Sequence, residues 1–468
     1  MYRKKFFVII ALILLFSPSK VIFAQEDGEL PVYVVLPGEN LTEIAGKFNI
    51  SLNELISANN ILDINLISAG TQLVIPGLEG VSGVLKAEPV AFGDQFQAIL
   101  KRNKLSLENF KKLNPVTSPS EIYAGATLVL PELLEADNLN SNTVMNQENS
   151  LFTTAIQIGK NPWVIFQENF DQPALFLPGD GLYYHSIEEA ALVTSFSDEI
   201  SEIDVNPLPM VQGHTVAVYI YAKQHGIFIG SLGEKPLTFF EDESNGFYYS
   251  LNGISAIAAP GLVPLKITGI LEDGEEFSVQ QNILLTSGGY PNETLTVEQT
   301  TVEQEVVQKE NDQIQQILNP ITSKRFWTSN FRFPVDGSLD DGTIAFSSYF
   351  GSRRSYNNGQ YSGYHGGLDF SVVLMSLNIY APAPGQVIFT GLMNIRGNTL
   401  FIDHGQGVVS GYAHLNEFKV NVGDFVEEGQ LIGIIGKTGR VTGPHLHWDI
   451  WVNGTQVDPF DWTNNTYP

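Results

Sequence analysis

The chain has 468 residues, a formal net charge of −26 and no cysteine. This length predicts about three domains. The lack of cysteine excludes disulfides, thiolate metal sites and a lipid-modified cysteine within this sequence. The negative charge argues against electrostatic binding to nucleic acid, anionic membranes or anionic wall polymers. Any binding to a cell wall must therefore come from specific recognition.

Residues 1–24 have the pattern of an export signal. Basic residues precede an uncharged apolar run at 6–16, which is too short to span a bilayer. Cleavage after Ala24 would remove four basic and no acidic residues, taking the net charge from −26 to −30. We expect a secreted protein in the cell wall, periplasm or cell envelope, with no membrane contact beyond a possible uncleaved signal.

Residues 33–76 and 90–131 repeat each other at a constant shift of 55 positions. A fixed shift without slippage indicates a duplicated structural unit. The pattern in each copy predicts a strand, two helices and a second strand, and Ser51 is a suitable cap for the second helix of the first copy. The matched pairs are Gly38 and Gly93, Ser51 and Ser106, Leu52 and Leu107, Asn59 and Asn114, Gly70 and Gly125, Leu73 and Leu128, and Pro76 and Pro131.

These copies resemble the LysM module, a small βααβ domain. The segments PGENLTEIA and AGTQLVIP carry the resemblance in the first copy, at 31–77, while the second copy, at 87–132, is degenerate. The resemblance implies binding to glycans that contain N-acetylglucosamine, such as peptidoglycan. We expect the first module to bind, and leave open whether the second binds or only packs.

The middle of the chain changes character twice. Residues 133–150 are polar with little apolar periodicity and are interpreted as a linker. Residues 152–290 are predicted to be rich in β-structure, and 207–290 resemble an Ig-like β-sandwich that serves spacing or protein contact. The expected strands include 216–222, 247–253 and 263–271.

Residues 291–324 are predicted to form a linker before the last domain. Their apolar residues fall on one helical face, with Asn319 and Pro320 ending the helix, and a disordered acidic tether is the alternative. Residues 325–468 alternate short apolar runs with glycine-rich turns, a pattern that predicts an antiparallel β domain. The predicted fold is therefore multidomain and mainly β.

Three short motifs in this last domain hold four of the eight histidines. Imidazole and carboxylate are the usual zinc ligands, and a catalytic zinc site takes three protein ligands and keeps one position open. No HExxH helix is present, which excludes the thermolysin-type arrangement. The motifs supply His365 and Asp369 in YHGGLDF, His414 in GYAHL, and His445 and His447 in GPHLHWDI.

Strand alternation predicts the geometry of the HLHWDIW run. His445, His447 and Asp449 should share one face, with the two histidines about 7 Å apart along the strand. Asp449 either orients a metal ligand or faces solvent. The glycines between His365 and Asp369 argue against a helix there, so a loop or strand should bring these two residues to His447.

The three motifs, in this order, resemble those of the lysostaphin-type zinc peptidases of family M23, over residues 330–462. The resemblance implies one Zn²⁺ per catalytic domain, held by His365, Asp369 and His447, and a catalytic pair formed by His414 and His445. Enzymes of this type cut peptide cross-links of bacterial cell walls. His404 in DHGQG is expected to be structural.

The expected function is that of a secreted zinc endopeptidase. It would hydrolyse peptide bonds in peptidoglycan stems or cross-bridges, with LysM holding the glycan and the active site taking the peptide. A non-catalytic wall-binding regulator of another hydrolase is the alternative, although such proteins typically lose zinc ligands. A structural wall adhesin would leave the histidines unexplained.

Overall fold

The computed structural model describes residues 30–64, 67–78, 80–116, 118, 121–132, 139, 141–145, 150–169, 181–184, 199–297, 303–359, 361–371 and 376–468. The chain divides into two compact units, Met1–Lys86 and Ala87–Pro468, and each is described by itself. The predicted signal at 1–24 and much of the predicted linker at 133–150 lie outside the described residues. Among the described helices, none is both long and apolar enough to cross a bilayer.

The first two repeats have the predicted βααβ order. In the first unit, β1 pairs antiparallel with β2, and capping boxes at Asn40 and Ser51 begin the two helices between these strands. The first copy consists of β1 (Val32–Val34), α1 (Leu41–Lys47), α2 (Leu52–Ala58) and β2 (Gln72–Val74). The second consists of β3 (Val84–Pro89), α3 (Phe96–Arg102), α4 (Leu107–Leu113) and β4 (Thr127–Pro131).

The strand character expected from residue 152 is wrong for the first part of that region, which forms two helices. A capping box between Ser150 and Thr153 begins the first helix, and Pro162 stands at the start of the second, where its missing N–H costs nothing. These local signals outweigh the aromatic and β-branched composition. The segment contains β5 (Ser141–Val144), α5 (Leu151–Gln157), α6 (Pro162–Asn169) and β6 (Gly181–Tyr184).

The predicted β-sandwich follows. Two antiparallel-rich sheets, ordered β11-β10-β14-β15-β8 and β12-β13-β9-β7, enclose one core to which Ile203, Val218 and Ile267 contribute. The strands are β7 (Ile200–Asn206), β8 (Met210–Val211), β9 (Thr215–Ala222), β10 (Gly226–Leu232), β11 (Lys235–Thr238), β12 (Phe240–Asp242), β13 (Phe247–Gly253), β14 (Gly261–Leu271) and β15 (Glu276–Thr286).

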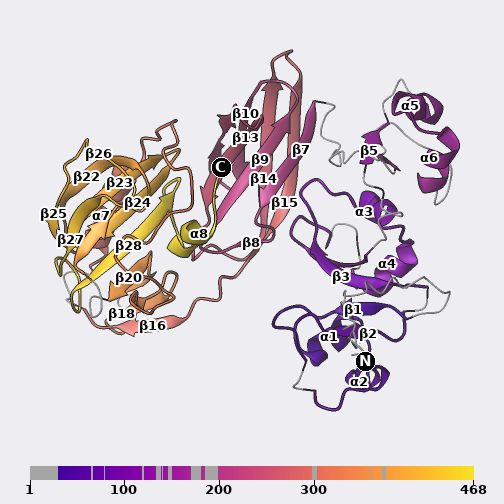
Figure 1. Ribbon diagram of the computed structural model, residues 1–468, viewed down its shortest axis with the longest axis horizontal. Helices are drawn as coiled ribbons and strands as arrows, with labels where there is room; N and C mark the ends of the chain where they lie inside the picture. Colours follow the sequence, from indigo (N-terminus) through magenta and orange to yellow (C-terminus); the bar gives the residue numbers. More distant parts are fainter. Residues whose placement is uncertain are drawn as a thin grey trace, which may run out of the picture. The chain divides into compact units, whose positions relative to one another are not determined.

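The C-terminal region is built on a sheet ordered β17-β20-β28-β24-β23-β22-β26, and Figure 1 shows β20, β28 and β24 side by side in its orange and yellow part. As predicted, Leu446, Trp448 and Ile450 enter the core beneath this sheet. Its strands are β17 (Phe346–Ser348), β20 (Leu368–Ser371), β22 (Gly385–Met393), β23 (Gly397–Gly405), β24 (Val408–Ala413), β26 (Phe425–Val426) and β28 (His445–Val452). Around it lie β21 (Asn378–Tyr380), β25 (Leu415–Phe418), β27 (Leu431–Ile435), β29 (Thr455–Val457) and α8 (Pro459–Asn464).

The segment before this region folds onto it. The strand β16 (Asn292–Leu295) pairs in parallel with β18 (Arg353–Tyr356), which also pairs with β19 (Tyr361–Tyr364). The helix α7 (Gln304–Leu318) buries Ile314 and Leu318 in a cluster with residues of β23, β24 and β28. The part of the chain interpreted as a linker therefore contributes a strand and a helix to the C-terminal fold.

The β-sandwich and the C-terminal region share a hydrophobic core. Ala217, Tyr249 and Leu251 of the sandwich belong to the same buried cluster as Trp448. Polar contacts reinforce the junction, since the Asp461 carboxylate accepts a hydrogen bond from the Thr215 amide at 2.7 Å. The Trp462 indole N–H donates to the Thr215 hydroxyl at 2.9 Å.

His404 makes the stability of this core sensitive to acid. Burial lowers the pKa of the His404 imidazole to about 4, although its contact with the Pro384 carbonyl opposes this shift. The folded pKa is below the unfolded value of about 6.5, so stability is complete above pH 6.5 and is lost as the pH falls towards 4. The full effect is on the order of 3 kcal/mol.

Urea unfolding at pH 7 and pH 4.5 tests this expectation. His404→Gln should flatten the pH dependence relative to the wild type. An unaltered pH dependence in His404→Gln would remove His404 as its source.

Candidate active site

Strand register brings the two sequence-distant motifs together. Asp369 on β20 stands directly opposite His447 on β28, and Ala413 stands opposite His447 on the other side. Directly opposed residues of an antiparallel pair have neighbouring side chains. Gly367 permits this approach, because a Cβ there would lie 2.2 Å from the Trp448 carbonyl oxygen. His365 precedes β20 by three residues, so loop and strand converge as predicted.

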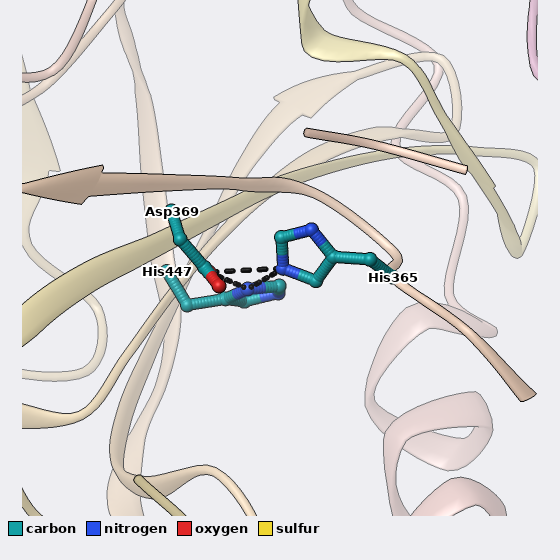
Figure 2. Close-up of side chains that lie close together, drawn as sticks. All are labelled: His365, Asp369 and His447. Atoms are coloured by element: carbon teal, nitrogen blue, oxygen red, sulfur yellow. Dashed lines mark hydrogen bonds and ion pairs between the residues drawn. The ribbon is translucent and has the colours of Figure 1, made fainter. Parts of the chain in front are cut away.

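His365, Asp369 and His447 meet at one point (Figure 2). The His365 Nε2 atom lies 2.9 Å from Asp369 Oδ1 and 3.0 Å from His447 Nδ1, and His447 Nδ1 lies 2.8 Å from the same oxygen. All three residues are buried, and in the described part of the chain they form one group with metal-ligand geometry.

On each of the two imidazoles, the ring nitrogen that faces away from this point has a polar partner of its own. The other ring nitrogen therefore directs its lone pair towards the point. His365 Nδ1 donates to the Tyr349 carbonyl at 2.9 Å, which leaves Nε2 as an acceptor. His447 Nε2 faces Asp449 Oδ2 at 3.6 Å, so Nδ1 is its inward acceptor. Three acceptors this close repel one another unless a proton or a metal cation lies among them. Two imidazoles and one carboxylate match the ligand set of a catalytic zinc, whose ligand atoms lie about 2.0–2.2 Å from the ion.

Electrostatics keep the carboxylate charged. Burial alone would raise the pKa of Asp369, but without a bound cation His365 and His447 can hold a proton towards it, and their charge and hydrogen bonds then keep its pKa well below its usual value. Burial lowers the pKa of His365. Burial also acts to lower the pKa of His447, but hydrogen bonds to Asp369 and Asp449 raise it overall. The site therefore offers an anionic oxygen to a cation.

The other two motif histidines lie beside this group. The ring centroids of His414 and His445 are 4.8 Å apart, and those of His414 and His447 are 6.2 Å apart. Nδ1 of His414 donates to the Thr438 carbonyl at 2.8 Å, and Nδ1 of His445 donates to the Gly443 carbonyl at 2.9 Å. Both rings therefore present Nε2. Burial, reinforced by the neighbouring histidines, lowers the pKa of His414 to about 3, so it is neutral at pH 7.

Further charged side chains hold the three acceptors in place. Asp449 is fully buried rather than exposed, pairs with Arg396, and accepts from Gln456 Nε2 at 2.8 Å. Arg354 lies 3.6 Å from the second oxygen of Asp369 and 3.3 Å from Glu293 of β16. Contacts of this kind orient metal ligands and fix their protonation.

The helix α7 also reaches the site. The buried carboxylate of Glu310 accepts from the backbone amides of Ile395 at 2.6 Å and Arg396 at 3.1 Å. The Arg396 carbonyl in turn accepts from the His414 amide at 2.9 Å. His414 has a φ of 66°, a conformation that costs energy for a residue with a side chain. Glu310 thus anchors the turn that holds His414 in this backbone conformation.

A groove of about 1010 Å³ opens over the five motif residues. Its walls come from several parts of the chain, including Glu310 on α7, Arg354 on β18, Arg440 in the loop before β28 and Lys235 on β11 of the sandwich. The groove can therefore hold an extended ligand against the histidines. His404 does not belong to it, because its ring is enclosed between the Pro384 carbonyl and the Ser410 hydroxyl, each 2.7 Å away.

Replacing Glu310 by Ala should loosen the backbone of His414. Two buried amides would lose their acceptor, at about 1–3 kcal/mol each, so exchange of the His414 amide should rise about tenfold or more. Hydrogen-exchange mass spectrometry of the full-length protein measures this. Glu305→Ala, which removes an exposed carboxylate from the same helix, is the control. Equal exchange in the two variants would contradict the anchoring role.

Comparison with known proteins agrees with the motif resemblance. A model of peptidase family M23 matches residues 363–459, and a model of the LysM domain matches residues 33–76 and 90–131. Peptidoglycan DD-endopeptidase ShyA of Vibrio cholerae is 36% identical over 127 residues, which are 27% of this chain and 28% of that protein. DD-carboxypeptidase/endopeptidase Mpg of Neisseria meningitidis is 40% identical over 95 residues, which are 20% of this chain and 22% of that protein.

Among solved structures, the catalytic domain of the antimicrobial peptidase lysostaphin from Staphylococcus simulans is 27% identical. The match covers 28% of this chain and 98% of that chain, with a TM-score of 0.23. This chain spans less than a third of the length of the two curated relatives. The chain contains a peptidase family M23 domain together with two LysM domains.

Proposed function

We propose that this protein is an exported, zinc-dependent endopeptidase that hydrolyses peptide bonds of peptidoglycan and is held on the wall by its LysM domains. The observation that carries the proposal is the convergence of His365, Asp369 and His447 on one point, with inward lone pairs and a charged carboxylate. The family M23 match over the same residues supports it.

His365, Asp369 and His447 would hold the zinc ion, with one ion in the site. When bound, zinc supplies Lewis acidity, which polarises a peptide carbonyl and acidifies water. Asp449, held by Arg396 and Gln456, keeps the outer nitrogen of His447 occupied and its inner nitrogen directed at the ion.

His414 and His445 would move the proton. His414 is neutral at pH 7, and its Nδ1–H is committed to Thr438, so its Nε2 can accept the proton of the attacking water. That proton is needed again on the leaving amine when the peptide bond breaks. His445 presents its own Nε2 3.8 Å from Asp369 Oδ1, close enough to share this transfer or to donate to the developing oxyanion.

The bond proposed for cleavage is a peptide cross-link between D-amino acids. The two curated relatives are named as a peptidoglycan DD-endopeptidase and a DD-carboxypeptidase/endopeptidase. The groove over the histidines suits a peptide chain, since its walls combine apolar residues with Arg354 and Arg440.

The non-catalytic alternative is disfavoured by the same geometry. A regulator that only binds the wall needs neither a buried charged ligand set nor two neighbouring imidazoles with free Nε2 atoms. Export through residues 1–24 would place the protein in the compartment of its proposed substrate.

Substitution of the ligands and of the proton-handling pair should have separable effects. His447→Ala should lose both zinc and activity, because two ligands hold the ion poorly. His445→Ala should keep zinc near one equivalent and lose activity by about 100- to 10,000-fold. Metal content by mass spectrometry and release of new amino termini from purified walls measure the two effects, with the exposed His225→Ala as control. A zinc-loaded wild type that releases no termini would contradict the proposal.

Digested muropeptides should identify the bond. Mass spectrometry should show cross-linked dimers converted to monomers, with each product pair gaining one water. Unchanged dimers alongside shortened stems would contradict the assignment to cross-links while leaving the peptidase activity in place.

A further inference from the structure

Residues 141–184 contain a third strand–helix–helix–strand unit outside the two LysM matches. The strands β5 and β6 pair antiparallel, as β1 and β2 do in the first copy. Between them lie α5 and α6, with seven and eight residues, and the four helices of the first two copies have seven each. Figure 1 shows α5 and α6 as a pair beside β5.

In each of the three units, a buried or half-buried asparagine joins the second helix to the closing strand through the same hydrogen bonds. Asn59, Asn114 and Asn169 follow one another at intervals of 55 residues. Each side-chain amide donates to the carbonyl four residues earlier in its helix and to a carbonyl in the closing strand, and its oxygen accepts from the amide of that same strand residue. The helix partners are Leu55, Phe110 and Ile165, and the strand partners are Val74, Val129 and Tyr183.

Caps and core repeat at the same interval. Asn40, Gln95 and Ser150 are the residues that precede the first helix of each unit. Leu55, Phe110 and Ile165 are each fully buried. Ile165 belongs to a separate small core, which it forms with Met145, Ala155 and Leu182. The helix caps, the core residues and the asparagine contacts share a period of 55 residues, which indicates a third copy of one duplicated unit.

The third copy differs from the others on its solvent side. Phe152, Ile156 and Trp163 are 64%, 58% and 75% exposed. The residues 55 positions earlier are Gln97, Lys101 and Glu108, and those 110 positions earlier are Thr42, Gly46 and Asn53. The core and the asparagine contacts are therefore kept, while surface positions that are polar or glycine in the first two copies are apolar in the third. Exposed apolar surface of this kind marks an interaction site.

We infer that residues 141–145, 150–169 and 181–184 belong to a third wall-binding module, whose apolar face, the exposed side chains of Phe152, Ile156 and Trp163, takes the uncharged glycan strand of peptidoglycan. Charge favours this ligand: a chain with a net charge of −26 is repelled by anionic polymers, so wall contacts must come from uncharged surfaces. An indole ring offers a flat apolar face to the C–H face of a sugar ring. The inference rests on the proposed attachment of the first two modules to the wall.

Three modules on one chain also change the strength of attachment. When the first module is bound, the next binds at a high effective concentration set by the connecting chain, so weak sites sum to tight binding. A third site of modest affinity would hold the M23 domain on the polymer between cleavage events.

The fold of the third copy is tested by Asn169→Ala in the full-length protein. Hydrogen-exchange mass spectrometry should show faster exchange, by about tenfold or more, in 151–169 and no change in 41–58 or 96–113. Asn59→Ala should instead speed exchange in 41–58 and leave 151–169 unchanged. Wild-type amides at 151–169 that exchange without protection would overturn the assignment.

The ligand is tested by Trp163→Glu, which installs the residue type found at the matching position of the second copy. Ile227→Glu is the control, because Ile227 on β10 of the sandwich is also 75% exposed and the charge change is the same. The affinity of the full-length protein for purified peptidoglycan, stripped of anionic polymers, should fall about tenfold with Trp163→Glu and less than twofold with Ile227→Glu. The exchange pattern of 151–169 should stay unchanged.

Two results would overturn the inference. Equal wall affinity of Trp163→Glu and the wild type would exclude this face from glycan binding. If Trp163→Glu lost binding to phosphatidylglycerol vesicles and kept its wall affinity, the face would be assigned to lipid binding instead. A wild type that does not bind the wall at all would contradict the LysM attachment in the proposed function, and is therefore distinguished from a failure confined to the third module.

Discussion

The antiparallel pairing of β20 with β28 is the constraint on which the site depends. It sets Asp369 opposite His447, and a shift of one residue would turn both side chains to the opposite face of the sheet. The two glycines after His365 let this pairing form without a clash, and the Tyr349 carbonyl then fixes which imidazole nitrogen of His365 faces inward. The acceptor set is thus a product of strand register and of hydrogen bonds to the backbone.

The surroundings of this pairing make the site rigid. Asp449 and Arg396 stabilise the orientation of His447, while Arg354 and Glu293 lie behind Asp369. Glu310 of α7 secures the turn beneath His414. Two of these carboxylates belong to the segment between the sandwich and the M23 domain. That segment therefore contributes to the geometry of the site, beyond joining two domains.

The five motif residues could be predicted from the sequence because their signals are local. Alternation along one strand predicted that His445, His447 and Asp449 share a face, and the resemblance to family M23 implied their partners. Glu310 and Arg396 gave no such signal, since their contacts depend on where a helix and a distant hairpin turn meet. The third repeat was not predicted, for another reason. Its constant shift of 55 ends after Asn169, because its strand partner Tyr183 follows 14 residues later, whereas Val74 follows Asn59 and Val129 follows Asn114 by 15.

His365, Asp369 and His447 are proposed to form a zinc site, and X-ray absorption at the zinc edge of the purified full-length protein measures the ligands of the ion. The wild type should show one zinc with two imidazoles among four or five nitrogen and oxygen ligands at about 2.0–2.2 Å, and His447→Ala, which loses the ion, should show no zinc edge above background. A zinc environment without imidazole scattering, or one unaltered in His447→Ala, would contradict the proposed zinc site.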